Sequence, residues 1–340
     1  MEPVRYVVYG AGAVGGIIGG LLHVAGRHVT LVARGAHLDA IRDGGLRLDT
    51  GSGVVAVPAP ATDTAAEVDW TKDTAVIVAV KSHQAGQALA DLRAHAPSQT
   101  AIVCATNGIA TESAALRLFA RTYALCVMLP STHLEPGLVV AKCHPVPGIL
   151  DIGRIPEGTD AVTREVASDL LAAGFVSEER ADILAWKRRK LLLNVGNGVD
   201  ASFQAGRSAE ALIELAVAEG ASVLAAAGLP VISAESDRLR RGDLLRRRED
   251  LSPTGGSTWQ SLQRGTGNSE IDYLAGEIVL QGRLHGVPTP ACEAIVRVTH
   301  DLASAGGPPR SRDAHVVMAG LDRAAMTPGR NDSGPPSPEG

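Results

Sequence analysis

Three glycines near the start of the chain, Gly10, Gly12 and Gly15, have the spacing G-x-G-x-x-G. An apolar run over residues 6–9 precedes them, and a small-residue apolar stretch follows. In a strand–turn–helix unit, the first glycine permits a sharp turn and the second lets a pyrophosphate approach the backbone. The third lets the helix pack close to the strand, and the N–H groups at the helix start attract the anion. The pattern therefore predicts a dinucleotide site. The residues expected to line it are Gly10, Ala11, Gly12, Ala13, Val14 and Gly15.

The choice of dinucleotide depends on Arg34, which follows the second predicted strand at 28–33. An acidic residue at this place normally binds the ribose 2′-hydroxyl, whereas an arginine suits a 2′-phosphate. We therefore expect NADPH rather than NADH. The competing interpretation is that Arg34 is an ordinary solvated arginine.

Two further polar residues, Lys81 and Asn107, each follow an unbroken apolar run, at 74–80 and 101–105. Such runs are typical of central parallel strands that are covered on both faces. Ligands of open α/β sheets bind at the carboxyl ends of the strands. We therefore expect both side chains to line the cofactor–substrate cleft, although each could instead be a helix cap or a loop residue.

Lys190 and Asn194 are four residues apart in a stretch with helical character, 185–197, so they share one helix face. Asparagine is a poor helix former, so its place in mid-helix needs a reason. Lysine is scarce in this chain, with five in 340 residues, and its amine can be tuned chemically as a guanidinium cannot. From these residues alone, a surface lysine is as good an interpretation as a catalytic one.

The elements that must position these residues fall into two blocks. Strands and helices alternate up to about residue 179, and the chain is helical and charged from 180 onwards. We predict a dinucleotide-binding domain over 1–179, a helical domain over 180–305 and a largely disordered tail over 306–340, with a weak helix near 314–325. The segment 132–137 is predicted as a turn. The charged run 237–250 is predicted as a solvated helix, and 271–284 as a further helix.

Composition narrows the class of protein. The chain has 340 residues, 45% hydrophobic residues and a net charge of −5, which excludes nucleic acid and anionic membranes as expected partners. The four cysteines form no C-x-x-C pair and are predicted to be buried free thiols in a reducing cytoplasm. The residues at the start of the given sequence lack the pattern of a signal peptide or a membrane span, so we expect neither. We assign no metal ligands.

Several separated motifs resemble one family when taken in order. They are Gly10-Ala11-Gly12-Ala13-Val14-Gly15-Gly16, Val32-Ala33-Arg34, Ala79-Val80-Lys81, Thr106-Asn107-Gly108, Lys190-Leu191-Leu192-Leu193-Asn194 and Glu270-Ile271-Asp272-Tyr273-Leu274-Ala275-Gly276. Their order is similar to that in ketopantoate reductases (2-dehydropantoate 2-reductases), over roughly residues 4–303. Agreement of several motifs in order is more specific than any single motif.

The resemblance implies an α/β fold, with an N-terminal Rossmann-type domain, an all-helical C-terminal domain and the active site between them. It implies NADPH-dependent reduction of ketopantoate, a 2-oxo acid, to (R)-pantoate on the way to pantothenate and coenzyme A. It also implies the site residues. Lys190 and Glu270 correspond to catalytic residues, Asn194, Asn107, Ser257 and Asn197 to substrate-binding residues, and Lys81, Asn107 and Glu270 to residues of the cofactor cleft. The oligomeric state stays open, a homodimer being one option.

Two departures from the family pattern affect the helical domain. The family commonly has a second asparagine four residues after the first, but Gly198 stands there and Asn197 comes one residue early. The tryptophan that commonly lies two residues before the lysine is here Trp186, four before it, which leaves Lys187 as a rival for the catalytic role.

Alternatives therefore remain at the level of the sequence. Thr258 could take the place of Ser257 if the alignment slips by one residue. The altered asparagine spacing and the tail also leave room for a relative that reduces another ketone or an imine in specialised metabolism. A non-catalytic NADPH-binding sensor is the third possibility.

Overall fold

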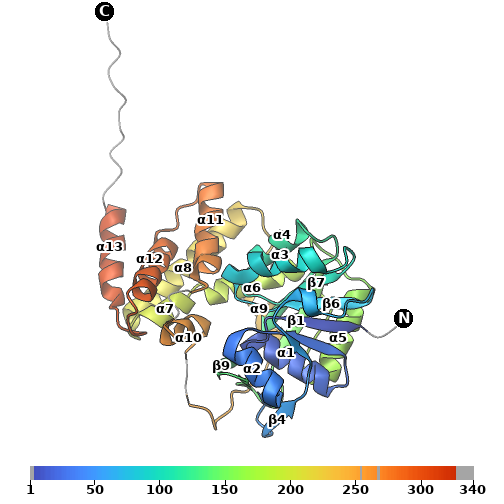
Figure 1. The fold of residues 1–340 in the computed structure, drawn as a ribbon. Helices are drawn as coiled ribbons and strands as arrows, with labels where there is room; N and C mark the ends of the chain where they lie inside the picture. The colour runs from blue at the N-terminus through green and yellow to red at the C-terminus, as the bar shows by residue number, and fades with distance from the viewer. Residues whose placement is uncertain (1–3, 253–254, 266–268, 327–340) are drawn as a thin grey trace, which may run out of the picture.

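The computed structural model describes residues 4–252, 255–265 and 269–326, which form a lobe built on a β-sheet and a lobe of helices (Figure 1). The sheet lobe contains the seven-stranded order β11-β8-β7-β6-β1-β2-β5. All neighbouring strands are parallel except β11, which runs antiparallel to β8. The strands are β1 (Arg5–Tyr9), β2 (Val29–Val32), β5 (Ala61–Thr62), β6 (Thr74–Val78), β7 (Ala101–Cys104), β8 (Thr122–Met128) and β11 (Ile149–Arg154).

Helices cover both faces of this sheet, which explains why its central strands are apolar throughout. Alternate residues of β1 point to opposite faces: Tyr6 and Val8 join one core cluster, and Val7 and Tyr9 another. The first cluster includes residues of α1 (Ala13–Val24) and α5 (Ala161–Ala172), and the second includes residues of α3 (Ala85–His95) and α4 (Ala110–Leu116). The sheet edge that carries the site is therefore held from both sides.

A second sheet of four strands, in the order β4-β3-β10-β9, packs against α1. Its strands are β3 (Leu46–Asp49), β4 (Val54–Val57), β9 (Ser131–Glu135) and β10 (Leu138–Ala141). The prediction of a turn over 132–137 is wrong for most of that segment, because Ser131–Glu135 pairs with β10 and only the tip at 136–137 turns. A strand that is exposed on one face lacks the apolar run that would mark it in the sequence.

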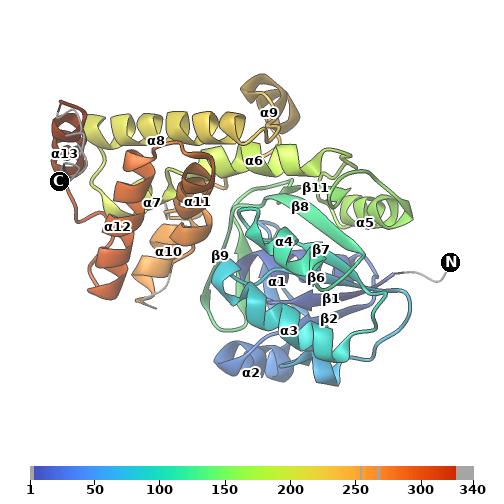
Figure 2. The same cartoon turned by 90° about the horizontal axis from the view of Figure 1, so that it is seen from above.

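The helical lobe begins with α6 (Ile183–Asn194), which packs on β8 and β11 and leads from the sheet to the other helices (Figure 2). The rest of the lobe comprises α7 (Asn197–Ser202), α8 (Arg207–Ala226), α9 (Ala234–Arg241), α10 (Ser257–Gln263), α11 (Ala275–His285) and α12 (Pro290–Ser304). Its core includes Leu192, Val199, Leu212, Ile278 and Ile295. Helix α6 therefore contacts the sheet on one side and the other helices on the other side, so it connects the two lobes.

Two predicted helices of this lobe differ in the structure. The charged run 237–250 is helical only to Arg241, where Gly242 adopts φ +42°, and Asp237 is fully buried rather than solvated. Asp237 pairs with Arg241 in the same run, whereas Arg240 and Arg248 pair with Asp151 and Asp49 outside it, which a charge pattern does not show. The helix predicted from 271 begins at Ala275, after a short 3-10 turn at Ile271–Tyr273.

The tail segment carries α13 (Ala314–Met326), near the residues where a weak helix was expected, and this helix packs against α8. The rest of the predicted tail, 327–340, lies outside the described residues. Within the described chain every helix is too short or too polar to span a bilayer. The four cysteines are buried and free, as predicted.

Candidate active site

The glycine turn between β1 and α1 has the geometry that its spacing predicts. Gly10 has φ +101°, and a Cβ there would lie 2.7 Å from a methyl of Val80. A Cβ on Gly15 would lie 2.1 Å from the Gly10 carbonyl oxygen, so α1 can approach the turn only with glycine at that position. Around Gly12, by contrast, nothing lies within 4 Å of a built Cβ. This open space, next to a helix start whose N-cap has no side-chain bond, fits a pyrophosphate.

Arg34 lies two residues after the end of β2 and is the N-cap residue of α2 (Gly35–Gly44), close to where the sequence places it. Its guanidinium lies 3.5 Å from the hydroxyl of Tyr9, which itself donates to Asp91. The side chain is otherwise exposed beside the turn, so its remaining donors are available to an anionic group on a ribose.

Lys190 projects from α6 onto the carboxyl edge of the sheet. Its ammonium donates to Oδ1 of Asn107 at 2.7 Å and to the backbone carbonyl of Val127 in β8. Burial lowers the pKa of this amine to about 8, the nearby charge of Lys187 acts in the same direction, and Glu270 opposes the shift. The structure thus brings Lys190 and Asn107 together, at a site where the lysine can give up a proton near neutral pH.

Glu270 lies across the same edge and contacts Lys81 rather than Lys190. Its carboxylate is 2.6 Å from the Lys81 ammonium and accepts from the backbone N–H and the hydroxyl of Ser82. Burial opposes ionisation of this group, yet Lys81 and Ser82 outweigh it and hold the pKa of Glu270 below its usual value. Glu270 is therefore a carboxylate, and its charge raises the pKa of Lys190 across space rather than through a direct bond.

The remaining expected substrate residues come from three helices of the other lobe. Asn194 ends α6, Asn197 begins α7 and Ser257 begins α10. Oδ1 of Asn197 is 3.9 Å from the Cβ position of Gly256, which places it beside the start of α10. The side chains of Asn194, Asn197 and Ser257 make no hydrogen bond within the described parts of the chain, so their polar groups are free for a ligand.

Gly198 and Thr258, the other positions that the sequence left open, point into the protein. A Cβ on Gly198 would lie 2.6 Å from Ile295 and 2.7 Å from Ile271, so an asparagine cannot occupy that position without moving the helices. Thr258 is only 1% exposed and packs inside the lobe. Ser257 and Asn197 are the residues at these places whose side chains are only partly buried.

Lys187, the rival lysine, is buried and already paired. Its side chain is 3% exposed, and its ammonium lies 2.5 Å from Oε1 of Glu112. It also donates to the backbone carbonyls of Thr106 and Leu125. A lysine held in this way has no donor directed at a substrate, which leaves Lys190 as the candidate for proton transfer.

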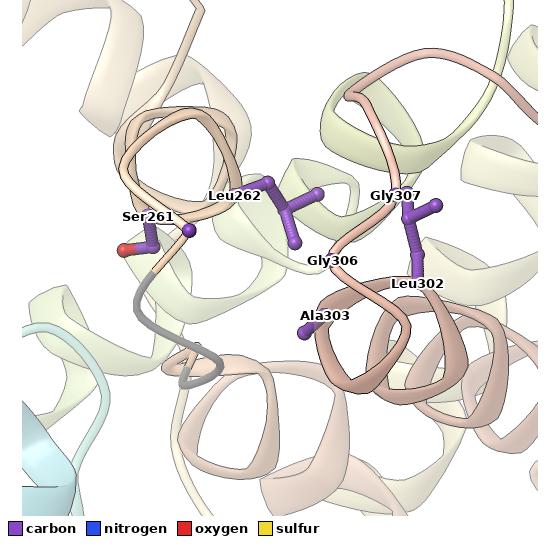
Figure 3. A pocket seen from close by; sticks show the side chains of 7 residues that line it. Ser261, Leu262, Leu302, Ala303, Gly306 and Gly307 are labelled. Atoms are coloured by element: carbon purple, nitrogen blue, oxygen red, sulfur yellow. The ribbon is translucent and has the colours of Figure 1, made fainter.

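The structure also contains a small hollow away from these residues, between α10 and the end of α12 (Figure 3). It is lined by Ser261, Leu262, Gly265, Leu302, Ala303, Gly306 and Gly307. None of these side chains is ionisable or can transfer a proton to a ketone. The hollow is therefore a packing feature of the helical lobe.

Family models match both lobes. The model described as "Ketopantoate reductase PanE/ApbA" matches residues 6–157, and the model of the family's C-terminal part matches residues 182–303. The chain belongs to the ketopantoate reductase PanE/ApbA family. It is therefore an oxidoreductase that acts on a CH–OH group, with a Rossmann-type domain for a nicotinamide dinucleotide. The boundary predicted at 179/180 stays a prediction.

Individual relatives align with this reductase over most of both chains. The 2-dehydropantoate 2-reductase of Pyrococcus horikoshii is 27% identical over 294 residues, which cover 84% of this chain and 93% of the relative. The crystal structure of a PanE/ApbA family ketopantoate reductase from Ralstonia eutropha superimposes with a TM-score of 0.75 and 26% identity, over 89% of this chain and 99% of that one. A D-mandelate dehydrogenase, solved with NADH and anilino(oxo)acetate, shares the fold with a TM-score of 0.77 at 23% identity, over 89% of this chain and 99% of that one.

Sequence reasoning missed two residues of this reductase that contact the site. Ser82 binds Glu270, and its signal was its place in the polar strand end beside Lys81. His37 accepts from the Gly137 N–H through Nδ1 and donates to the Ala11 carbonyl through Nε2, so it ties the glycine turn to the second sheet. Burial lowers the pKa of His37, which favours this neutral form. No spacing in the sequence connects His37 with either partner.

Proposed function

We propose that this reductase uses NADPH to reduce a 2-oxo acid, ketopantoate, to (R)-pantoate, a step of pantothenate and coenzyme A synthesis in the cytoplasm. The observation that carries the proposal is the ammonium of Lys190, held by Asn107 at the carboxyl edge of the sheet that bears the glycine turn. A proton donor fixed beside a dinucleotide site is what ketone reduction requires.

The protein's part of the reaction is to place charge and a proton where the ketone oxygen becomes negative. NADPH supplies the hydride that the ketone carbon accepts. Lys190 holds the proton at Nζ and donates it to the oxygen, and Asn107 fixes the direction of that donor. General acid help of this kind contributes roughly a hundred- to ten-thousand-fold in rate.

The substrate's carboxylate and hydroxyl groups need partners of their own. We assign these contacts to Asn194, Asn197 and Ser257, whose polar groups stand at the ends and starts of helices around α6. Helix starts such as that of α10 also favour an anion. Glu270, with Lys81 held against it, is assigned to accept from a substrate hydroxyl.

A different 2-oxo acid is the second candidate, and Gly198 is the observation that favours it. The packed surroundings of Gly198 exclude the family's second asparagine at that position. Asn197, at the first position of α7, would then have to make the substrate contact instead. A panel of 2-oxo acids that includes ketopantoate and an aromatic 2-oxo acid distinguishes the two candidates.

The test of the reaction is Lys190→Met, assayed by NADPH oxidation with that panel. We expect kcat to fall by about a hundredfold or more, while the Kd of NADPH stays within about twofold, because the loss is that of a general acid. Lys72→Met is the matched control, since this lysine side chain is 84% exposed and pairs only weakly with Asp73. A fall of less than about tenfold would refute the role of Lys190. No oxidation with any 2-oxo acid would favour a non-catalytic NADPH-binding protein.

A further inference from the structure

Lys187 and Glu112 form a charged pair that is buried directly behind the site. Their side chains are 3% and 2% exposed, and Nζ of Lys187 lies 2.5 Å from Oε1 of Glu112. The carboxylate accepts no hydrogen bond from any other described group, so its charge is compensated by Lys187. It stands in the first turn of α4, where the helix dipole also favours a negative charge.

The same ammonium holds a short segment of backbone in place. Lys187 donates to the carbonyl of Thr106 at 2.9 Å and is paired with Glu112, so it contacts both ends of the segment 106–112. Asn107 lies inside this segment, and its Oδ1 accepts the hydrogen bond from Lys190. The second carbonyl held by Lys187 is that of Leu125 in β8, two residues before Val127, which also accepts from Lys190. Lys187 thus holds the backbone next to both groups that accept from Lys190: Thr106 beside Asn107, and Leu125 two residues before Val127.

Stability alone does not account for such a pair. Replacing a buried ion pair by apolar residues of similar size is often neutral or stabilising, because desolvation of the charges is costly. This pair is costly in energy, and it binds the backbone beside both residues that hold the proton donor. This reasoning rests on the role of Lys190 proposed above.

We propose that Lys187, neutralised by Glu112, is a positioning residue for the reduction: it holds the Asn107 segment and the end of β8 so that the Lys190 ammonium points at the substrate. It also places a like charge one turn away from Lys190 on the same helix face. The other titratable groups facing Lys190 are Cys126 of β8 and Glu270. Removing Lys187 therefore alters both the geometry and the charge around Lys190.

The experiment uses the paired variant Lys187→Met with Glu112→Gln, which removes both charges and leaves neither partner buried alone. We expect kcat to fall about tenfold or more, because the donor is misplaced, with the KM for NADPH within about twofold. The titration of Lys190 is followed by NMR of protein labelled at lysine Cε, in which only five lysines give signals. Because the charge of Lys187 lowers the pKa of Lys190, its removal should raise that pKa.

The matched control is Arg27→Gln with Asp169→Asn, which removes a partly buried pair at the amino end of the sheet. We expect it to lower the melting temperature and leave both readouts unchanged. If Lys187→Met with Glu112→Gln does the same, the pair is merely structural and the proposal is overturned. Lys187→Met with Glu112→Met replaces the first variant if that one does not fold. If the wild-type protein reduces no 2-oxo acid, the proposed function fails, and the titration of Lys190 alone then decides whether Lys187 controls it.

Discussion

Two lysines three residues apart on one helix have opposite environments. Lys187 is enclosed by a carboxylate and two carbonyls, whereas Lys190 reaches the sheet edge and is held by one amide and one carbonyl. In the sequence, both are lysines of one helix, and neither the residue type nor the spacing distinguishes their roles. Only the direction of each side chain separates a fixed cation from a proton donor.

The pH dependence of turnover follows from the environment of Lys190. Because burial lowers its pKa from 10.5 to about 8, the amine is protonated below that pH and loses its proton as the pH rises through it. We therefore expect kcat/KM for reduction to fall above pH about 8, since this parameter reports the free enzyme. The residual activity of Lys190→Met should show no fall in kcat/KM near pH 8. A fall that begins only near pH 10.5 in the wild type would contradict the assignment.

Arg34 carries the prediction of cofactor preference. Arg34→Ala should raise the KM for NADPH by about tenfold and leave the KM for NADH within about twofold, because only NADPH carries the 2′-phosphate that a guanidinium binds. Steady-state kinetics with both cofactors measures this. Arg42→Ala is the control, since that arginine also lies on α2 but pairs with Glu67. A wild-type preference for NADH would contradict the prediction.

At the scale of elements, the strand–turn–helix unit explains why one sequence motif is so informative. All three glycines lie within six residues, 10–15, so local spacing specifies the whole turn. Gly15 is needed where α1 meets the turn, whereas the space around the Cβ position of Gly12 is open. Replacing each glycine by alanine should therefore have different effects on stability at the two positions.

Gly15→Ala should weaken NADPH binding at least about tenfold and lower the free energy of unfolding by about 1–3 kcal/mol, because its methyl group collides with the Gly10 carbonyl. Gly12→Ala should weaken NADPH binding while leaving stability nearly unchanged, because nothing lies within 4 Å of the added atom. Titration calorimetry and denaturant unfolding measure the two effects. Equal stability of both variants would refute this account of the turn.

At the scale of the molecule, the two lobes are joined by buried ion pairs as well as by α6. Arg240 of α9 donates to both oxygens of Asp151 in β11, at 2.8 and 2.5 Å, and Arg180 contacts the same carboxylate. The Asp151 side chain is only 3% exposed. These contacts hold the helical lobe at the edge of the sheet beside the site.

Arg240→Met should lower the free energy of unfolding by about 3 kcal/mol, because it leaves a buried carboxylate with one cation fewer. Urea unfolding followed by tryptophan fluorescence measures the change. Arg5→Met is the control: its ion pair with Asp69 is exposed, so the effect should stay below about 1 kcal/mol. Similar losses in both variants would show that the Asp151 pair contributes no more than a surface pair.

The sequence by itself determined the features that depend on neighbours along the chain. These are the glycine turn, the apolar strands that end in Lys81 and Asn107, and the single helix face shared by Lys190 and Asn194. Spacing and hydrophobic periodicity encode such features directly.

Tertiary structure alone decided which charges meet. Lys81 pairs with Glu270 189 residues away, Lys187 with Glu112, and Arg240 with Asp151. For the same reason the sequence does not show that Asp237, Arg240 and Arg248 are withdrawn from solvent in the otherwise largely exposed run 237–250. Desolvation and charge pairing depend on what the fold brings together in space, and no local pattern of residues contains that information.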